Sequence, residues 1–548
     1  MRQRAFDTVS RSNYAKFMKI VIADKISERG ITLLREAKWD VVVSTAATLH
    51  QELHDADGLI VRSATKVTAE LLEKAPKLRV VGRAGVGIDN IDVDATTRRG
   101  VLVMNTPGGN SVGVAELTVA LMLSMARSVP RLNTSIHEGR WEKAGAGGTE
   151  LRGKTLGLVG LGRIGGEVAR RARAFEMKVL AHDPYVSVSV AQELEVELVP
   201  LADLLSRSDY VSLHTGVSPA TEKMINAQTL AQFKKGARLV NCARGELVDE
   251  AALAEALKSG HLAGAALDTF AVEPPKNSPL IGVAGLIATP HVAGSTAEAQ
   301  EEVGTQIAQQ IKDYLAEGQI RNAVNLPSLS AEQYRRIRPY LGLGDRLGAF
   351  LAQVAGAGSL GSPARIRIRY AGEPAELGTH VLSSAVLAGL LNSFMDEKVN
   401  LVNAVEIARS RGLEIEESTR RRERGFLNTI EVALVNGGKE LAVEGTVLSD
   451  LSLRILRFDG IPLEAPLEGT LLLTRNRDVP GVIGEIGTTL GRLGVNIATF
   501  ALGRRAPTMG ADAVALVRVD GEAGEAILGP IRAIPSITEA RLIHLPQN

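Results

Sequence analysis

The sequence of 548 residues contains little cysteine, few aromatic residues and almost no net charge. Its single cysteine, Cys242, excludes an intramolecular disulfide and is typical of a reducing compartment, so we expect a cytoplasmic location. Aromatic residues make up only 3%, and aliphatic side chains must therefore build the hydrophobic cores. The net charge of +1 argues against a nucleic acid or a membrane surface as the main partner. No apolar run reaches the ~18–20 residues that a membrane-spanning helix needs.

The length exceeds what one hydrophobic core supports, and about three or four domains are expected. Residues 1–17 differ from the rest, because they carry several basic residues against a single acid, Asp7. A strand-like run, 18–22, follows directly. We expect residues 1–17 to be a disordered extension, or the product of a start codon assigned too early for a protein that begins at Met18. An arginine-rich, acid-poor transit peptide is the alternative.

From Met18 onward, short β-branched runs alternate with helical stretches, a pattern typical of α/β domains. A long helix is predicted over 114–127, and another over 297–317 that could pack back on the first domain and make it discontinuous. Composition predicts linkers at 325–330 and 464–469. The early strands are expected over 20–23, 41–44, 58–61, 79–82 and 101–104. Later elements are expected over 365–370 (strand), 401–411 (helix), 470–474 (strand), 481–493 (helix) and 496–501 (strand).

Three polar residues each follow an apolar, strand-like run: Arg244 after 237–240, Glu273 after 263–267 and His291 after 286–288. Successive strand ends of a parallel sheet gather on one edge, so these side chains should converge in a cleft. A guanidinium can clamp a carboxylate, and an imidazole held by a carboxylate can move a proton near neutral pH. Each residue alone could instead have a structural role. Arg244 could be an ion-pair partner, Glu273 a solvated turn acid and His291 a cap at a strand end. All three at these positions favour redox chemistry on a hydroxy acid.

A dinucleotide-binding pattern precedes this set. A strand over 154–159 runs into the glycine-rich loop 160–165, followed by a helix to residue 175 and a strand over 178–181 that ends at Asp183. The glycines allow close approach of the backbone to a pyrophosphate at the helix start. Asp183 can accept hydrogen bonds from a ribose hydroxyl and would repel a 2′-phosphate, so NAD is expected rather than NADP. The alternative, a tight turn without a ligand, leaves Asp183 unexplained.

Several motifs together resemble a known family, the long-form D-3-phosphoglycerate dehydrogenases, which belong to the D-isomer-specific 2-hydroxyacid dehydrogenases. The motifs that carry the resemblance lie at 58–68, 81–92, 105–111, 160–165, 241–245 and 264–268. Farther on, Asn403-Ala404, 411–414, 445–447 and Asp459-Gly460 are similar to an intervening domain of these enzymes. The stretches 476–484 and 494–498 are similar to an ACT domain, a small amino-acid-sensing fold.

The resemblance implies a fold class of two Rossmann-like, doubly wound parallel α/β domains, followed by an α+β intervening domain and a βαββαβ ACT domain. The expected substrate domain is discontinuous, and the NAD-binding domain is inserted into it. The expected boundaries are 1–17 for the extension, 18–107 with 295–326 for the substrate domain, 108–294 for the NAD domain, 327–467 for the intervening domain and 468–548 for the ACT domain.

The resemblance also implies an activity: NAD-dependent oxidation of 3-phospho-D-glycerate to 3-phosphooxypyruvate, the first step of phosphorylated serine biosynthesis. His291 would exchange the hydroxyl proton, Glu273 would bind the other ring nitrogen, and Arg244 would hold the substrate carboxylate. L-serine is the expected effector, and the resemblance implies that it binds at the interface of paired ACT domains. The expected assembly is a homotetramer, and no metal site is expected. The expected NAD contacts are Gly160, Gly162, Arg163, Ile164, Gly165, Asp183, His214, Thr215, Cys242, Ala243 and Asp268, which would orient the nicotinamide carboxamide. The expected substrate contacts are Arg62, Ser63, Arg83, Gly85, Val86, Gly87 and Asn110. The expected effector contacts are Asn476, Asp478, Asn496 and Ile497.

The sequence departs from the family pattern at two of these sites. Asn476 stands where an aromatic residue or a histidine is common. The order Ala293-Gly294 reverses the usual Gly-Ala, so Ala293 is expected to adopt a glycine's backbone angles. Two other functions remain open at this point. One is a reductase for hydroxypyruvate or glyoxylate, against which Arg62 and the ACT motif argue. The other is a non-catalytic, NAD-sensing scaffold similar to a corepressor family that shares this fold.

Overall fold

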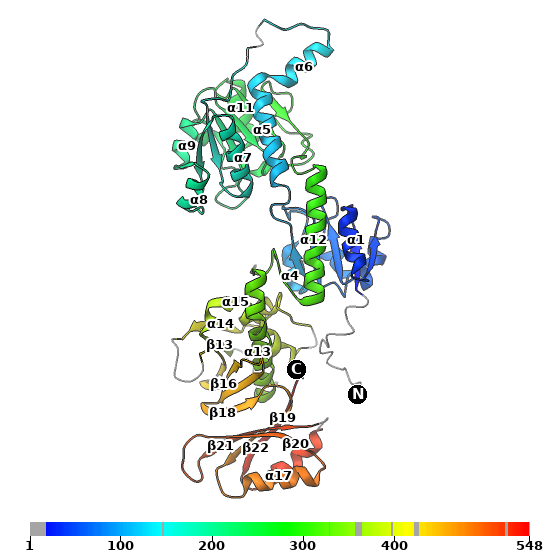
Figure 1. Cartoon of the computed structure of the whole chain (residues 1–548), viewed down its shortest axis with the longest axis vertical. Helices are drawn as coiled ribbons and strands as arrows, with labels where there is room; N and C mark the ends of the chain where they lie inside the picture. The colour runs from blue at the N-terminus through cyan, green and yellow to red at the C-terminus, as the bar shows by residue number, and fades with distance from the viewer. Residues whose placement is uncertain are drawn as a thin grey trace.

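The computed structural model describes residues 18–144, 147–327, 329–356, 364–395, 398–420, 427–520 and 524–546. The prediction for residues 1–17 lies outside this range. The described residues form four β-sheets, which define four units. Along the elongated molecule these units lie in the order second, first, third and fourth (Figure 1). Two sheets are parallel and two are wholly or largely antiparallel, which confirms the predicted fold class.

The first unit is a five-stranded parallel sheet in the order β2-β1-β3-β4-β5. Its strands are β1 (Lys19–Ile22), β2 (Asp40–Val43), β3 (Gly58–Val61), β4 (Val80–Arg83) and β5 (Leu102–Met104). Its helices are α1 (Glu28–Glu36), α2 (Leu49–Glu52), η2 (Leu53–Asp55), α3 (Ala69–Glu73), α4 (Val93–Arg98) and, from far along the chain, α12 (Ala297–Glu317). As predicted, α12 returns to this sheet, and its Ile307 and Ile311 share a core with Ile20 and Ile60.

The second unit is a seven-stranded parallel sheet in the order β12-β11-β10-β9-β6-β7-β8. Its strands are β6 (Thr155–Val159), β7 (Lys178–His182), β8 (Glu197–Leu198), β9 (Tyr210–Leu213), β10 (Arg238–Asn241), β11 (Gly264–Leu267) and β12 (Leu286–Ala288). Its helices are α5 (Ser111–Arg127), α6 (Val129–His137), α7 (Arg163–Ala174), α8 (Val188–Glu193), α9 (Leu201–Arg207), α10 (Ala227–Leu230), η3 (Gly245–Leu247) and α11 (Glu250–Lys258). The strand order reverses between β6 and β9, which is where an open α/β sheet binds its ligand.

Among the residues that the structure describes, no single helix is long and apolar enough to cross a membrane. Helices α5 and α6 reach the required length and composition only when they are taken together across a 64° bend.

The third unit is a six-stranded mixed sheet in the order β14-β13-β15-β16-β17-β18. Its strands are β13 (Ala364–Ala371), β14 (Glu414–Thr419), β15 (Thr429–Asn436), β16 (Lys439–Val447), β17 (Leu453–Phe458) and β18 (Ile461–Pro466). Its helices are α13 (Ala331–Ala355), α14 (Glu373–Leu377), α15 (Thr379–Asn392) and α16 (Ala404–Ser410). Two asparagines join it to the first unit, since the Asn400 side chain donates to the carbonyl of Gly100 at 2.8 Å and the Asn403 side chain to that of Arg98 at 3.5 Å.

The fourth unit has the predicted βαββαβ order, and its antiparallel sheet runs β20-β21-β19-β22. Its elements are β19 (Gly469–Arg477), α17 (Val482–Arg492), β20 (Ile497–Arg504), β21 (Asp512–Val519), η4 (Glu525–Ile527), α18 (Leu528–Arg532) and β22 (Ile537–Leu545). The predicted linker 464–469 is wrong over most of its length. Residues 464–466 belong to strand β18, and Leu467 is fully buried, with its carbonyl accepting a hydrogen bond from Arg346.

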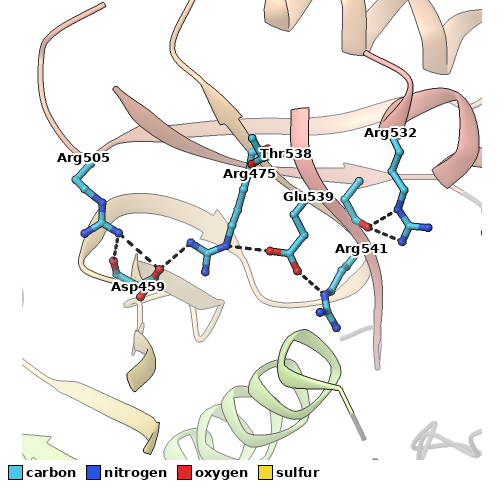
Figure 2. A network of polar contacts seen from close by, with 8 residues as sticks. Asp459, Arg475, Arg505, Arg532, Thr538, Glu539 and Arg541 are labelled. Atoms are coloured by element: carbon cyan, nitrogen blue, oxygen red, sulfur yellow. Dashed lines mark hydrogen bonds and ion pairs between the residues drawn. The ribbon is translucent and has the colours of Figure 1, made fainter. Parts of the chain in front are cut away.

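The third and fourth units share one hydrophobic core, which Leu471, Leu516 and Ile543 of the fourth sheet join. Figure 2 shows the polar contacts at this junction. The Asp459 carboxylate of the third unit lies 2.7 Å from Arg475 and 3.6 Å from Arg505, and Arg475 also lies 3.2 Å from Glu539. Helices α17 and α18 cover the other face of the sheet, so both of its faces are buried.

Helices α13 and α15 pack so closely that a methyl group at Gly389 would lie 1.8 Å from the Asp345 carbonyl oxygen. A Gly-to-Ala change inside a helix ordinarily stabilises a protein by about 1 kcal/mol. Here overpacking dominates, and we expect Gly389→Ala to destabilise the chain by about 1–3 kcal/mol or more. Gly487→Ala in α17, where nothing lies within 4 Å, is the matched control and should raise stability slightly. Thermal unfolding of both variants checks this, and a parent-like midpoint for Gly389→Ala would contradict the packing.

Candidate active site

The carboxyl ends of β10, β11 and β12 lie side by side in the second sheet, and the loops after them carry the predicted catalytic set. Nδ1 of His291 lies 2.8 Å from Oε2 of Glu273. The other carboxylate oxygen, Oε1, accepts from the Phe270 amide at 3.1 Å, which fixes the orientation of Glu273. Because Nδ1 is engaged, Nε2 is the ring nitrogen available for proton transfer. The imidazole is 49% exposed and can therefore reach a substrate.

Arg244 connects this edge to the first unit. A methyl group at Gly87 would lie 2.3 Å from Nη2 of Arg244, so the guanidinium lies directly against this glycine and a larger residue would displace it. The same nitrogen lies 3.4 Å from the Asp89 carboxylate. The backbone of Arg244 is held by Asn241, whose side chain donates to the Arg244 carbonyl at 2.7 Å. The guanidinium therefore lies against the glycine turn 85–89, between the first and second sheets.

Two further arginines of the first unit lie near Arg244. Burial lowers the pKa of Arg83, and the charges of Arg244 and Arg62 lower it further. Arg62 follows β3, and its position is fixed because its amide donates to Asp24 at 2.6 Å and its carbonyl accepts from Asn90 at 2.7 Å. Ser63 beside it is exposed. Arg83, with Arg244 and Arg62 near it, forms a group of three guanidiniums that suits a substrate carrying both a carboxylate and a phosphate.

The glycine-rich loop has the geometry of a dinucleotide turn. Gly160 has φ +98°, and a methyl group at Gly165 would lie 2.3 Å from its carbonyl oxygen, so neither position accepts a larger residue. Helix α7 begins at Arg163, and its free amides face the loop side of the sheet. The Asp183 carboxylate, which follows β7, accepts from the Leu161 amide at 2.8 Å. Asp183 and the glycine-rich loop 160–165 therefore lie side by side. One ligand could thus place its ribose at Asp183 and its pyrophosphate at the loop.

His214, Thr215, Cys242 and Ala243 follow β9 and β10 on the same edge. Burial lowers the pKa of His214 to about 4, and Nδ1 of that ring is enclosed with no hydrogen-bond partner among the described residues. Burial raises the pKa of the Cys242 thiol to about 12. Both side chains are uncharged at neutral pH. Two uncharged side chains, one of them with an unsatisfied polar atom, fit the nicotinamide half of the cofactor.

The loop after β12 differs from the prediction. The left-handed backbone falls on His291, with φ +52°, and not on Ala293. The reason is that the Asp268 carboxylate accepts from the Val292 and Ala293 amides, both at 2.9 Å, and these bonds turn the chain at His291. Asn110 lies at the same loop, because a methyl group at Gly294 would be 2.6 Å from its Nδ2. The role of Asp268 in holding this loop was missed from the sequence, although an acid directly after an apolar strand was the available signal.

Asn476 and Asp478 line a pocket of about 380 Å³ in the fourth unit. Asn476 is 3% exposed, and its Oδ1 is buried with no partner in the described part of the chain. Asp478 lies 3.3 Å from Arg504, a residue that no motif in the sequence indicates. The strand register brings Arg504 level with Asn476, because both pair with Ala513.

The other two predicted effector residues lie elsewhere. Ile497 begins β20 level with Val519, at the opposite end of the sheet, and the preceding Asn496 donates to Asp520 at 2.6 Å. The structure therefore brings Asn476 and Asp478 together and separates Asn496 and Ile497 from them.

Comparisons with known proteins agree with this geometry. Residues 119–293 match the NAD-binding domain of D-isomer-specific 2-hydroxyacid dehydrogenases, the class that the fold and site define. Residues 336–459 match the D-3-phosphoglycerate dehydrogenase intervening domain. The chain is 41% identical to D-3-phosphoglycerate dehydrogenase of Methanocaldococcus jannaschii over 96% of this chain and 100% of that one, and 38% identical to the Bacillus subtilis enzyme with the same coverage. A crystal structure of a Thermus thermophilus protein, at 35% identity and a TM-score of 0.52, covers 56% of this chain and 100% of that chain.

The chain therefore belongs to the D-3-phosphoglycerate dehydrogenase family. The family and the NAD cofactor predicted from the sequence are confirmed.

His214 is half-buried, with its Nδ1 enclosed, and its lowered pKa should make folding sensitive to acid. In the unfolded chain, histidine gains a proton below about pH 6.5, whereas His214 in the folded chain stays neutral to about pH 4. The unfolded state binds more protons between these values, so stability falls as the pH decreases through this window, by on the order of 3 kcal/mol in all. We expect His214→Gln to lose less stability than the parent between pH 6.5 and 4 in denaturant unfolding. Equal losses would show that His214 titrates normally.

Proposed function

We propose that this chain oxidises 3-phospho-D-glycerate to 3-phosphooxypyruvate with NAD, the first step of phosphorylated serine biosynthesis. The observation that carries the proposal is the Glu273–His291 pair, with its 2.8 Å hydrogen bond, on the strand edge that also carries Arg244. Arg83 lies near Arg244 and Arg62. The agreement with D-3-phosphoglycerate dehydrogenases over 96% of the chain supports this activity over a reductase or a scaffold.

In this mechanism, Nε2 of His291 takes the proton of the C2 hydroxyl. Glu273 holds the ring through Nδ1, selects the tautomer and stabilises the imidazolium that forms. Arg244 binds the substrate carboxylate and stabilises negative charge on the reacting oxygen. The amides of Val86 and Gly87 would bind the same carboxylate, whereas the Gly85 amide donates to the Arg83 carbonyl at 2.9 Å. The glycine-rich loop 160–165 and Asp183 would hold NAD, which would supply the acceptor for the hydride of C2.

The phosphate would bind Arg62, with Ser63 beside it and Arg83 behind. The Arg62 guanidinium donates to the Lys25 carbonyl at 3.3 Å, a weak contact that a phosphate would readily replace. Asp268, Gly162, Ile164, Thr215 and Ala243 would complete the NAD site, since they lie on the loops that the glycine turn and the strand ends define.

The test is NADH formation from 3-phosphoglycerate and NAD at alkaline pH. We expect His291→Ala to lower kcat by about 10²–10⁴-fold, because general acid–base catalysis is commonly worth that much. Full turnover by that variant would overturn the mechanism. Turnover of hydroxypyruvate or glyoxylate by the parent, with none of 3-phosphoglycerate, would assign the chain to the reductases.

Arg62→Ala tests, in the same assay, whether Arg62 binds the substrate phosphate. A charge-assisted hydrogen bond is worth about 1.5–3 kcal/mol, so kcat/KM for 3-phosphoglycerate should fall by roughly 10–150-fold. Reduction of unphosphorylated hydroxypyruvate should change little. Lys77→Ala removes an exposed cation elsewhere on the first unit and is the matched control.

For the domains, we propose boundaries at 18–107 with 295–326 (substrate), 108–294 (NAD), 327–467 (intervening) and 468–548 (ACT).

We also propose a homotetramer built from dimers of the NAD domain. Helix α6 extends away from the second sheet (Figure 1) and exposes Val129 and Ile136, and Trp141 beyond it is 81% exposed. Apolar side chains presented in this way support contact with a second copy.

L-serine is the proposed effector. The pocket at Asn476 and Asp478 offers an unsatisfied amide oxygen, a carboxylate and the Arg504 guanidinium, which suit an ammonium and a carboxylate. Asn496 lies at the other end of the sheet. Its predicted role therefore requires an effector site shared between two copies of the ACT domain.

If the site is shared, Asp478→Ala and Asn496→Ala should each abolish inhibition by L-serine, although the two residues are apart in one chain. The measurement is the ratio of turnover with and without serine for each variant. Asp450→Ala, an exposed acid of the third unit, should keep the parent ratio. Inhibition that survives Asn496→Ala would confine the site to the pocket of one chain.

A further inference from the structure

Asp268 binds the loop that carries His291 at four points. Its carbonyl accepts from the His291 amide at 2.8 Å. Its carboxylate accepts from the Thr289 hydroxyl at 2.5 Å and from the Val292 and Ala293 amides at 2.9 Å. The residues on both sides of His291, and His291 itself, are thus bound to one fully buried side chain and its backbone.

This binding explains an unfavourable backbone. His291 has φ +52°, a left-handed conformation that a non-glycine residue keeps only where its surroundings impose it. The imidazole must keep this backbone to reach Glu273 with Nδ1. A buried carboxylate in turn needs several donors, and the loop supplies them. The loop and the acid therefore hold each other in place.

The hydrogen bonds of Asp268 also connect it to the loop that carries Arg244. The Asp268 amide donates to the Asn241 carbonyl at 2.9 Å, and the Asn241 side chain donates to the Arg244 carbonyl at 2.7 Å. Asn241 is fully buried. Asn241 at the end of β10 thus holds the loop that carries Arg244, and Asp268 directly after β11 holds the loop that carries His291.

We propose that Thr289, acting through Asp268, is a positioning residue that sets the orientation of the His291 imidazole. The inference rests on the proposed function, since turnover is one of its readouts. It assigns Asp268 a role besides the predicted contact with the nicotinamide carboxamide. Thr289 helps to separate the two roles, because it is not a predicted cofactor contact and its substitution leaves the Asp268 carboxylate in place.

The experiment compares Thr289→Val with Thr269→Val. Both changes replace a hydroxyl by a methyl group on the same loop edge, but the buried Thr269 hydroxyl has no partner among the described residues. We expect Thr289→Val to lower kcat about 10–100-fold, as small misplacements of a reacting group do, and to change the pH profile of kcat. NADH binding, followed by fluorescence, should stay within about twofold of the parent. Thr269→Val should resemble the parent in all three measurements, and Thr289→Ser, which keeps the hydroxyl, should restore most of kcat.

Equal kcat for the two valine variants would overturn the proposal. So would a Thr289→Val defect that appears as weaker NADH binding, which would assign Asp268 to the cofactor alone.

A second readout needs no substrate. With only nine histidines, ¹⁵N-histidine spectra of the full chain can report the His291 tautomer, with His291→Ala for assignment. We expect a changed tautomer ratio in Thr289→Val and not in Thr269→Val. An unchanged ratio would refute positioning, whereas an inactive parent would refute only the proposed function.

Discussion

The parallel alignment of the strands in the first two sheets is the constraint on which the site depends. Parallel strands all end at one edge, and the loops after them must gather there. In the second sheet this edge carries Asp183, Arg244 and His291, and in the first sheet Arg62 and Arg83 end their strands in the same way. The close approach of Arg244 to Gly87 shows that the two edges face each other. The charged residues of the site therefore come from two separate units, and Arg244 of the second unit lies against Gly87 of the first.

Much of this edge could be predicted because its signals are local. Helix α12 and strand β12 begin and end where the apolar periodicity predicts, and Asp183 and the Glu273–His291 pair follow from their motifs. The 25-residue helix α13 was not predicted, because it contains Pro339 and closely spaced glycines that look like breaks. Those glycines let α15 approach, which is a property of the pair of helices and not of either sequence.

The errors have a common physical origin, since tertiary hydrogen bonds decided each of them. Residues 464–466 have the composition of a linker, but pairing with β17 makes them a strand. The glycine-like backbone was expected at Ala293, but the bonds to Asp268 place it at His291. Arg504 joins Asp478 only through the register of three strands. Register and loop turns depend on partners far along the chain, which motif reading does not supply.

The alternation of side chains along a strand gives the fourth unit two functions on one segment. Asn476 lines the pocket, whereas its neighbour Arg475 binds Asp459 of the third unit. Arg504 likewise lines the pocket, whereas Arg505 binds Asp459 (Figure 2 shows Arg475, Arg505 and Asp459). Any shift of β19 or β20 at the pocket therefore moves the contacts with the third unit, which in turn binds the first unit through Asn400. A continuous chain of contacts from the pocket to the first unit does not by itself couple ligand binding to turnover. A ligand at the pocket changes turnover only insofar as it binds one arrangement of these contacts more tightly than another.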